Sequence, residues 1–191
     1  MRAKSIEKRK PSFNTLGNAD LLARPGRIAL FCSNKCPGEI ILKCQDWANG
    51  VIGSDTVIVS GFHTPVERDC LRILLRGEHP TVICPARSLA GMRLPPAWKK
   101  AVESGTLCLA TNFPVSVRRV SIRTGEQRNR FAASLVESVL IPYAAPGSKT
   151  EFLVKNLLNP PKSRHTIYTF ASPYTENLRT MGCKVMDKEL K

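Results

Sequence analysis

Two stretches of the sequence place groups suited to phosphate at the expected starts of helices. An apolar periodic segment predicts one helix from about Glu126 to Glu137, and another predicts a helix from Lys149 to Leu158. The residues at these starts are Arg128, Asn129 and Arg130 in the first and Gly147, Ser148, Lys149 and Thr150 in the second. Helix N-termini offer backbone N–H donors and a favourable dipole to anions, and arginine adds charge. The spacing therefore predicts a phosphate site where the two helices begin.

The elements around these stretches alternate between short apolar runs and amphipathic helices. Runs near residues 28–32, 56–61, 80–84, 106–110, 138–142 and 165–170 have the length and composition of buried strands. The pattern Thr64-Pro65-Val66-Glu67 is a strong helix start, with a capping box and proline at the first position. The fold class expected is α/β, a doubly wound, mainly parallel Rossmann-like sheet of about six strands with helices on both faces.

Residues 1–26 and 172–191 lack this pattern. The first segment is rich in lysine and arginine and is expected to form a basic N-terminal arm with one helical turn. Residues 27–171 are expected to form the Rossmann-like domain, and residues 172–191 a C-terminal tail. The arm is interpreted either as an electrostatic contact to nucleic acid or as a solubilising terminus.

The charge of the chain favours a polyanionic partner. Its 29 Lys and Arg against 15 Asp and Glu give a formal net charge of +14, which favours nucleic acid over a membrane surface. No run approaches the roughly 18 apolar residues of a membrane span, and the N-terminus lacks the apolar stretch of a signal peptide. We therefore expect a cytoplasmic protein with no membrane partner. The seven cysteines are expected to be reduced thiols, with neither a metal nor a cofactor bound.

Loops at the carboxyl ends of the strands carry the remaining candidates, because ligands of open α/β sheets bind there. The candidate phosphate or nucleic-acid ligands in these loops are Ser33, Ser60, Gly61, His63, Arg87, Arg118, Arg119 and Arg123. Together with Arg128 and Arg130 they could neutralise a phosphodiester backbone, or they could form an ordinary solvated basic surface. In the long loop that runs to Gly125, Phe113 could stack on a base or anchor the loop on the core.

Two glutamates stand near the same loops. Glu67 and Glu151 both occupy the third position of an expected helix, where a carboxylate caps its own N-terminus. A structural function is therefore favoured over catalysis, and no catalytic residue is assigned. If the chain is an enzyme, Arg128 and Glu151 are the candidates for catalysis.

With these residues in view, the segment from Arg27 to Phe170 resembles the Rossmann-like core of the DNA-processing protein A family (DprA/Smf). The motif Arg128-Asn129-Arg130 followed by an apolar helix carries the resemblance best, together with Phe113-Pro114, the Ser60-Gly61 turn and the loop at Gly147-Ser148. The wider superfamily includes the LOG-type phosphoribohydrolases, whose glycine-rich motif is similar to the stretch from Pro146 to Glu151.

The resemblance implies binding of single-stranded DNA in a basic crevice, a homodimer, and delivery of DNA to a RecA-type recombinase during DNA processing or recombination. Two alternatives stay open: a LOG-type phosphoribohydrolase that cleaves nucleoside 5′-monophosphates, and a protein that senses a nucleotide.

Overall fold

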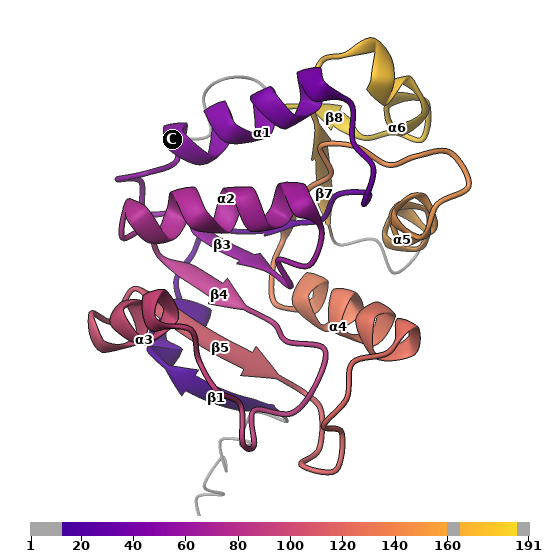
Figure 1. Cartoon of the computed structure of the whole chain (residues 1–191). Helices are drawn as coiled ribbons and strands as arrows, with labels where there is room; N and C mark the ends of the chain where they lie inside the picture. Colours follow the sequence, from indigo (N-terminus) through magenta and orange to yellow (C-terminus); the bar gives the residue numbers. More distant parts are fainter. Residues whose placement is uncertain (1–12, 160–164, 187–191) are drawn as a thin grey trace, which may run out of the picture.

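The computed structural model describes residues 13–159 and 165–186. The first part of the predicted arm, with Arg2, Lys4, Lys8, Arg9 and Lys10, lies outside the described residues. Within the described ranges the chain forms one eight-stranded sheet with helices on both of its faces (Figure 1). This confirms the predicted fold class.

The sheet has the order β1-β5-β4-β3-β2-β6-β7-β8, and all neighbours are parallel except β1, which runs antiparallel to β5. The chain leaves β2 for β3 on one side and later returns to β6 on its other side, so the order reverses at β2. Open sheets bind ligands beyond the carboxyl ends of the strands near such a reversal. The strands are β1 (Asn14–Gly17), β2 (Arg27–Leu30), β3 (Val57–Ser60), β4 (Thr81–Ile83), β5 (Leu107–Thr111), β6 (Ser138–Leu140), β7 (Thr166–Thr169) and β8 (Lys184–Val185).

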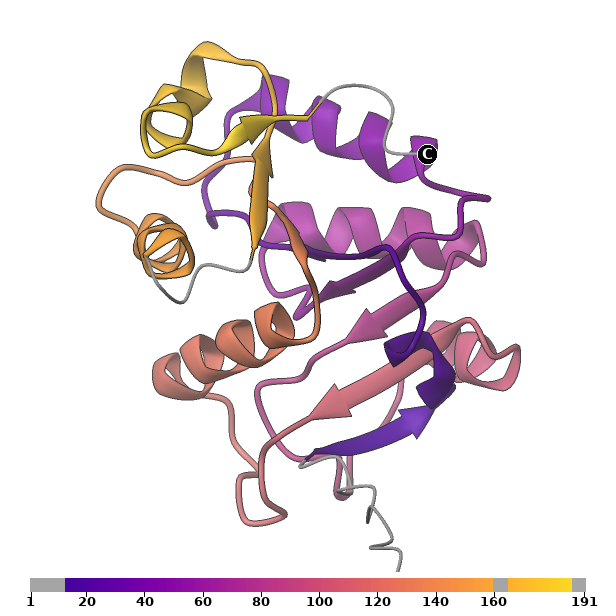
Figure 2. The ribbon, with the colours of Figure 1, turned by 180° about the vertical axis from the view of Figure 1, so that it is seen from behind.

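Two hydrophobic cores sandwich the sheet. On one face Ile40, Leu74 and Ala101 come from the helices that connect β2 to β5, and on the other Phe131, Val154 and Leu178 come from the later helices. Figures 1 and 2, drawn from opposite sides, both show α4 and α5 as neighbours. The helices are α1 (Gly38–Gly50), α2 (Pro65–Arg76), α3 (Pro96–Glu103), α4 (Ile122–Ser134), α5 (Lys149–Leu158) and α6 (Glu176–Thr180), with short 3₁₀ turns η1 (Ala19–Leu22) and η2 (Pro173–Thr175). No helix among the described residues is long and apolar enough to span a membrane.

The sheet has two strands more than expected, and both are edge strands. β1 lies in the segment assigned to the arm (Figure 2, indigo). In the adjoining η1, Leu21 is completely buried. The side chain of Asn18 ties this segment to the turn before β5 by donating to the Gly105 carbonyl over 2.8 Å. β8 lies in the segment assigned to the tail. All four residues of β1 are exposed, so β1 lacks the apolar run by which buried strands are recognised in a sequence.

The start of α4 also differs from the prediction. The helix begins at Ile122 rather than near Glu126, because Ser121 caps it: Ser121 Oγ accepts from Thr124 N over 3.1 Å, and Thr124 Oγ1 accepts from Ser121 N over 2.8 Å. Threonine takes the position that glutamate or glutamine usually holds in this motif. Arg128 and Arg130 therefore lie in the middle of the helix and not at its start.

Candidate nucleic-acid interface

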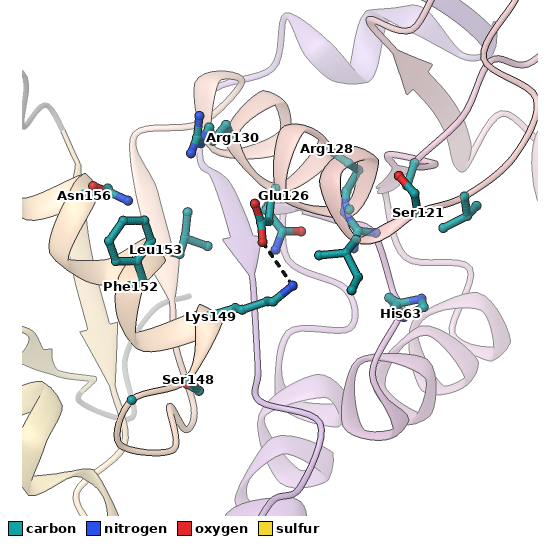
Figure 3. A pocket seen from close by; sticks show the side chains of 16 residues that line it. His63, Ser121, Glu126, Arg128, Arg130, Ser148, Lys149, Phe152, Leu153 and Asn156 are labelled. Carbon is teal, nitrogen blue, oxygen red and sulfur yellow. Dashed lines mark ion pairs between the residues drawn. The ribbon is translucent and has the colours of Figure 1, made fainter.

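A pocket of about 610 Å³ lies between α4, the start of α5 and the loop after β3. It brings together part of the predicted set: His63, Arg128, Asn129, Arg130, Gly147, Ser148 and Lys149. Figure 3 shows Phe152 and Asn156 of α5 on one side of it, His63 and Ser121 on the other, and Lys149 and Glu126 between them. The pocket therefore joins groups from three segments that are distant in the sequence.

Arg128 is the buried cation of this pocket. Arg128 is only 6% exposed, and its Nε atom, which is itself buried, has no hydrogen-bond partner among the described residues. A buried guanidinium is costly unless it is paired, because water no longer solvates its charge. Burial lowers the pKa of Arg128, and the negative charge of Glu67 partly opposes this effect. The arrangement leaves a desolvated positive group in the pocket wall, which an anion would satisfy.

Gly61 makes room for this arginine. A Cβ atom at position 61 would lie 1.2 Å from Arg128 Nη1 and 1.9 Å from Cζ, so any larger residue would displace the guanidinium. The preceding Ser60 is fully buried and does not line the pocket; its hydroxyl donates to the Leu30 carbonyl over 2.7 Å and accepts from Phe62 N over 3.1 Å. The Ser60-Gly61 turn thus shapes the floor under Arg128 without offering its own side chain.

Glu67 holds the strand-end loops together. One carboxylate oxygen accepts from Cys32 N over 3.0 Å, and the other accepts from His63 N over 2.7 Å and from Thr64 N over 3.3 Å. With Thr64 it forms the predicted capping box of α2. Because its oxygens are occupied by backbone donors, Glu67 fixes the loops after β2 and β3 beside Arg128.

The start of α5 forms another wall. Ser148 is the N-cap and accepts from Glu151 N over 3.2 Å, and its hydroxyl lies 3.2 Å from that of buried Ser33. Ser33 in turn accepts from Ala145 N over 3.0 Å. Ser33 therefore positions the loop that leads into α5 and is not among the pocket residues.

Glu151 is committed to structural contacts. Its carboxylate accepts from Gly147 N, Asn177 Nδ2 and Lys155 Nζ over 3.0, 3.0 and 3.1 Å. The Asn177 amide, the Gly147 N–H and the Lys155 ammonium lower the pKa of Glu151 to about 2. Glu151 does not line the described pocket, so the geometry favours the structural function expected from its capping position.

Several pocket residues were not expected from the sequence. Glu126 pairs with Lys149 across the pocket, with Oε1 3.1 Å from Nζ (Figure 3). The hydrophobic side chains of Val120, Ile122 and Phe152 line the pocket although they are 57%, 72% and 61% exposed. The spacing of Lys149, Phe152 and Asn156 on one helical face is the signal that would have found the residues of α5.

Other predicted ligands lie outside the pocket lining. Arg118, Arg119 and Arg123 are exposed on the loop and first turn before the pocket, whereas Arg87 and Thr150 are partly buried. Phe113 is 6% exposed, so the structure supports its interpretation as an anchor on the core. All seven cysteines are free thiols, and among the described residues no three His, Cys, Asp or Glu side chains are grouped to hold a metal ion.

Comparison with known proteins gives matches in structure only. No protein-family model matches the chain, and no curated protein matches its sequence. DprA from Helicobacter pylori, solved in work on its single-stranded DNA binding mode, superposes with a TM-score of 0.74 at 16% identity over 98% of this chain and 91% of its own. DprA from Streptococcus pneumoniae gives 0.73 at 17% identity and covers 91% of this chain. The molybdenum cofactor carrier protein of Chlamydomonas reinhardtii gives 0.55 at 12% identity, covering 86% of this chain and 92% of its own.

This chain spans 62% of the S. pneumoniae protein and nearly all of the solved H. pylori chain. Both DprA structures superpose better than the cofactor carrier does. The resemblance read from the sequence is thereby confirmed: the chain has the fold of DNA-processing protein A.

Proposed function

We propose that the pocket binds single-stranded DNA, with a backbone phosphate on Arg128, and that the protein is a non-catalytic DNA-binding protein. The observation that carries this proposal is the nearly buried, unpaired guanidinium of Arg128 in the wall of an otherwise open pocket. A phosphate in the pocket would balance the charge of this guanidinium, and charge-assisted hydrogen bonds of this kind are among the stronger ones.

The surroundings of Arg128 fit a nucleotide rather than a bare anion. The backbone N–H of Lys149 at the start of α5 and the Lys149 ammonium supply further donors for phosphate. The exposed ring of Phe152 offers a stacking surface, which a base can use only when it is unpaired. The net charge of +14 adds long-range attraction to a polyanion. A single strand satisfies all three features at once.

The structural neighbours support the same class of ligand, since the H. pylori DprA structure concerns binding of single-stranded DNA. Action in DNA processing or recombination, a homodimer, a RecA-type recombinase as partner and a cytoplasmic location belong to this proposal as well. A LOG-type hydrolase or a nucleotide sensor stays an alternative hypothesis, which release of free base from nucleoside monophosphates, or binding of mononucleotides in preference to DNA, would support.

The test is a titration with labelled single-stranded and double-stranded oligonucleotides of one length at low and moderate salt. We expect single strands to bind more tightly than duplexes. Arg128→Gln should weaken single-strand binding about ten- to hundredfold, as expected for loss of charge-assisted hydrogen bonds. Phe152→Ala should weaken it by about 1–3 kcal/mol, as expected for one stacked base.

The matched control is Arg72→Gln, because Arg72 is an exposed arginine of α2 that does not line the pocket and pairs with Asp69. This variant changes the net charge by the same amount as Arg128→Gln. Equal losses in the two variants would refute the site, and absence of single-strand binding at low salt would refute the function. Thermal unfolding of Arg128→Gln should be unchanged or higher, since the variant removes an unpaired buried charge.

A further inference from the structure

One feature of the pocket opposes its proposed ligand. Glu126 brings a carboxylate into the lining, on the same helix as Arg128 and one turn before Arg130. Its Oε1 atom lies 3.1 Å from Nζ of Lys149, the first residue of α5. A phosphate that enters this space therefore meets a cation that is already paired with a carboxylate.

The exposure and contacts of Glu126 and Lys149 indicate that a ligand can replace Glu126 as the partner of Lys149. The side chains of Lys149 and Glu126 are 63% and 47% exposed, and ion pairs in such positions are weak. Neither side chain makes any other hydrogen bond or ion pair within the described residues. Arg128, in contrast, is fixed by burial over Gly61. The pocket thus combines one permanently placed cation with one cation whose partner is replaceable.

We propose that Glu126 is a specificity-determining residue of the pocket, which holds Lys149 in the free protein and releases it only to a ligand phosphate. This inference rests on the proposed function of the pocket. The carboxylate reduces the affinity for any anion that cannot replace it on Lys149. A nucleotide chain with a phosphate on Arg128 brings further phosphates close by and can make this exchange. Single small anions meet an occupied lysine and a repelling carboxylate, so Glu126 favours polynucleotides over them.

The experiment compares Glu126→Gln with Glu78→Gln in single-strand titrations. Glu78 also pairs with a lysine, Lys100, over 3.5 Å in an exposed position, and it lies before β4, at the opposite end of the strands. Both variants raise the net charge by one, so their difference isolates the local effect. We expect Glu126→Gln to bind a single-stranded oligonucleotide about two- to fivefold more tightly than Glu78→Gln does, the size expected for an exposed charge pair. The affinity for inorganic phosphate, measured by its competition with the labelled oligonucleotide, should rise by a larger factor in Glu126→Gln than the affinity for the oligonucleotide does.

A double-mutant cycle with Lys149→Gln adds a second readout. If Glu126 acts through Lys149, the loss of affinity caused by Lys149→Gln should be larger in the Glu126→Gln background than in the wild type. Equal affinities of Glu126→Gln and Glu78→Gln would overturn the inference, as would weaker binding by Glu126→Gln, which would make Glu126 a brace between α4 and α5.

The outcomes for this inference and for the proposed function remain distinct. If the wild type binds single strands and Arg128→Gln weakens binding more than Arg72→Gln does, the function stands whatever Glu126→Gln does. If no protein in the set binds DNA at low salt, the proposed function fails, and this inference fails with it.

Discussion

Gly61 has no side chain, and this leaves room for the guanidinium of Arg128. Since a Cβ there would overlap the Arg128 guanidinium, Gly61→Ala should move that group out of its place over the turn. We expect single-strand affinity to fall by a factor similar to that of Arg128→Gln, about ten- to hundredfold. The stability should change little, because the overlapping atoms are the flexible end of a side chain. Oligonucleotide titration and urea unfolding of the same variant measure both effects.

Gly50→Ala serves as the control, because a Cβ at Gly50 would meet no atom within 4 Å. It should leave DNA affinity unchanged. Normal affinity of Gly61→Ala would show that the position of Arg128 above the turn is not what binds the ligand.

The sequence predicted which loops meet at the pocket better than which side chains face it. Arg128, Ser148 and Lys149 could be chosen because charge and helix-start patterns mark them. Glu126 and Phe152 could not, since their place in the lining depends on where α4 begins and on how α5 packs beside it. Arg118 and Arg119 have the same charge as Arg128 but lie outside the pocket lining. A run of arginines in a sequence does not show which of the side chains face a pocket.

Among the elements, α5 depends most on one acidic side chain. Glu151 accepts hydrogen bonds from the loop before the helix, from the second turn of α5 and from Asn177 of α6, so it joins three segments. Glu151→Gln should lower the free energy of unfolding at pH 7 by about 1–3 kcal/mol, the usual value for hydrogen bonds to a charged group. Urea unfolding gives this difference, with Glu137→Gln as an exposed control.

The same residue predicts a dependence of stability on pH. The pKa of Glu151 is about 2 in the folded protein, below its ordinary value of 4.5, so the folded state binds this proton less readily than the unfolded state. Its contribution to stability is therefore complete above about pH 4.5 and is lost as the pH falls toward 2. The wild type should lose more stability between pH 5 and pH 3 than Glu151→Gln. Parallel losses in the two proteins would contradict this assignment.

The parallel strands from β2 to β7 and all the helices between them were predictable, because buried apolar runs and capping residues mark them in the sequence. β1 and β8 were not, since edge strands are held by backbone pairing to β5 and β7 and need no apolar side chains of their own. The start of α4 was not predicted because Thr124 stands in its capping box where glutamate or glutamine is usual.

For the whole molecule, the charge predicts a steep effect of salt on DNA binding. Each phosphate contact with a single strand adds about 0.7 to the slope of log affinity against log salt. Removal of residues 1–12, which hold five lysines and arginines, should flatten this slope by about 1–3 units, whereas Arg128→Gln should change it by about one. Removal of residues 187–191, whose charges cancel, is the control. An unchanged slope after removal of residues 1–12 would assign the salt effect to the rest of the chain.

The direction of β1 determines at which end of the strands the described part of the chain begins. β1 runs antiparallel to β5, with Asn14 opposite Thr111 and Gly17 opposite Cys108. The chain therefore enters the sheet at the carboxyl ends of the parallel strands. The pocket also lies at the carboxyl ends of the strands. If β1 were parallel to β5, the start of β1 would lie at the amino ends of the strands, a strand's length away. We therefore expect the five lysines and arginines of residues 1–12 to act at the pocket's end of the sheet. A DNA strand captured by these charges would reach Arg128 by a search within one complex and not by a second collision.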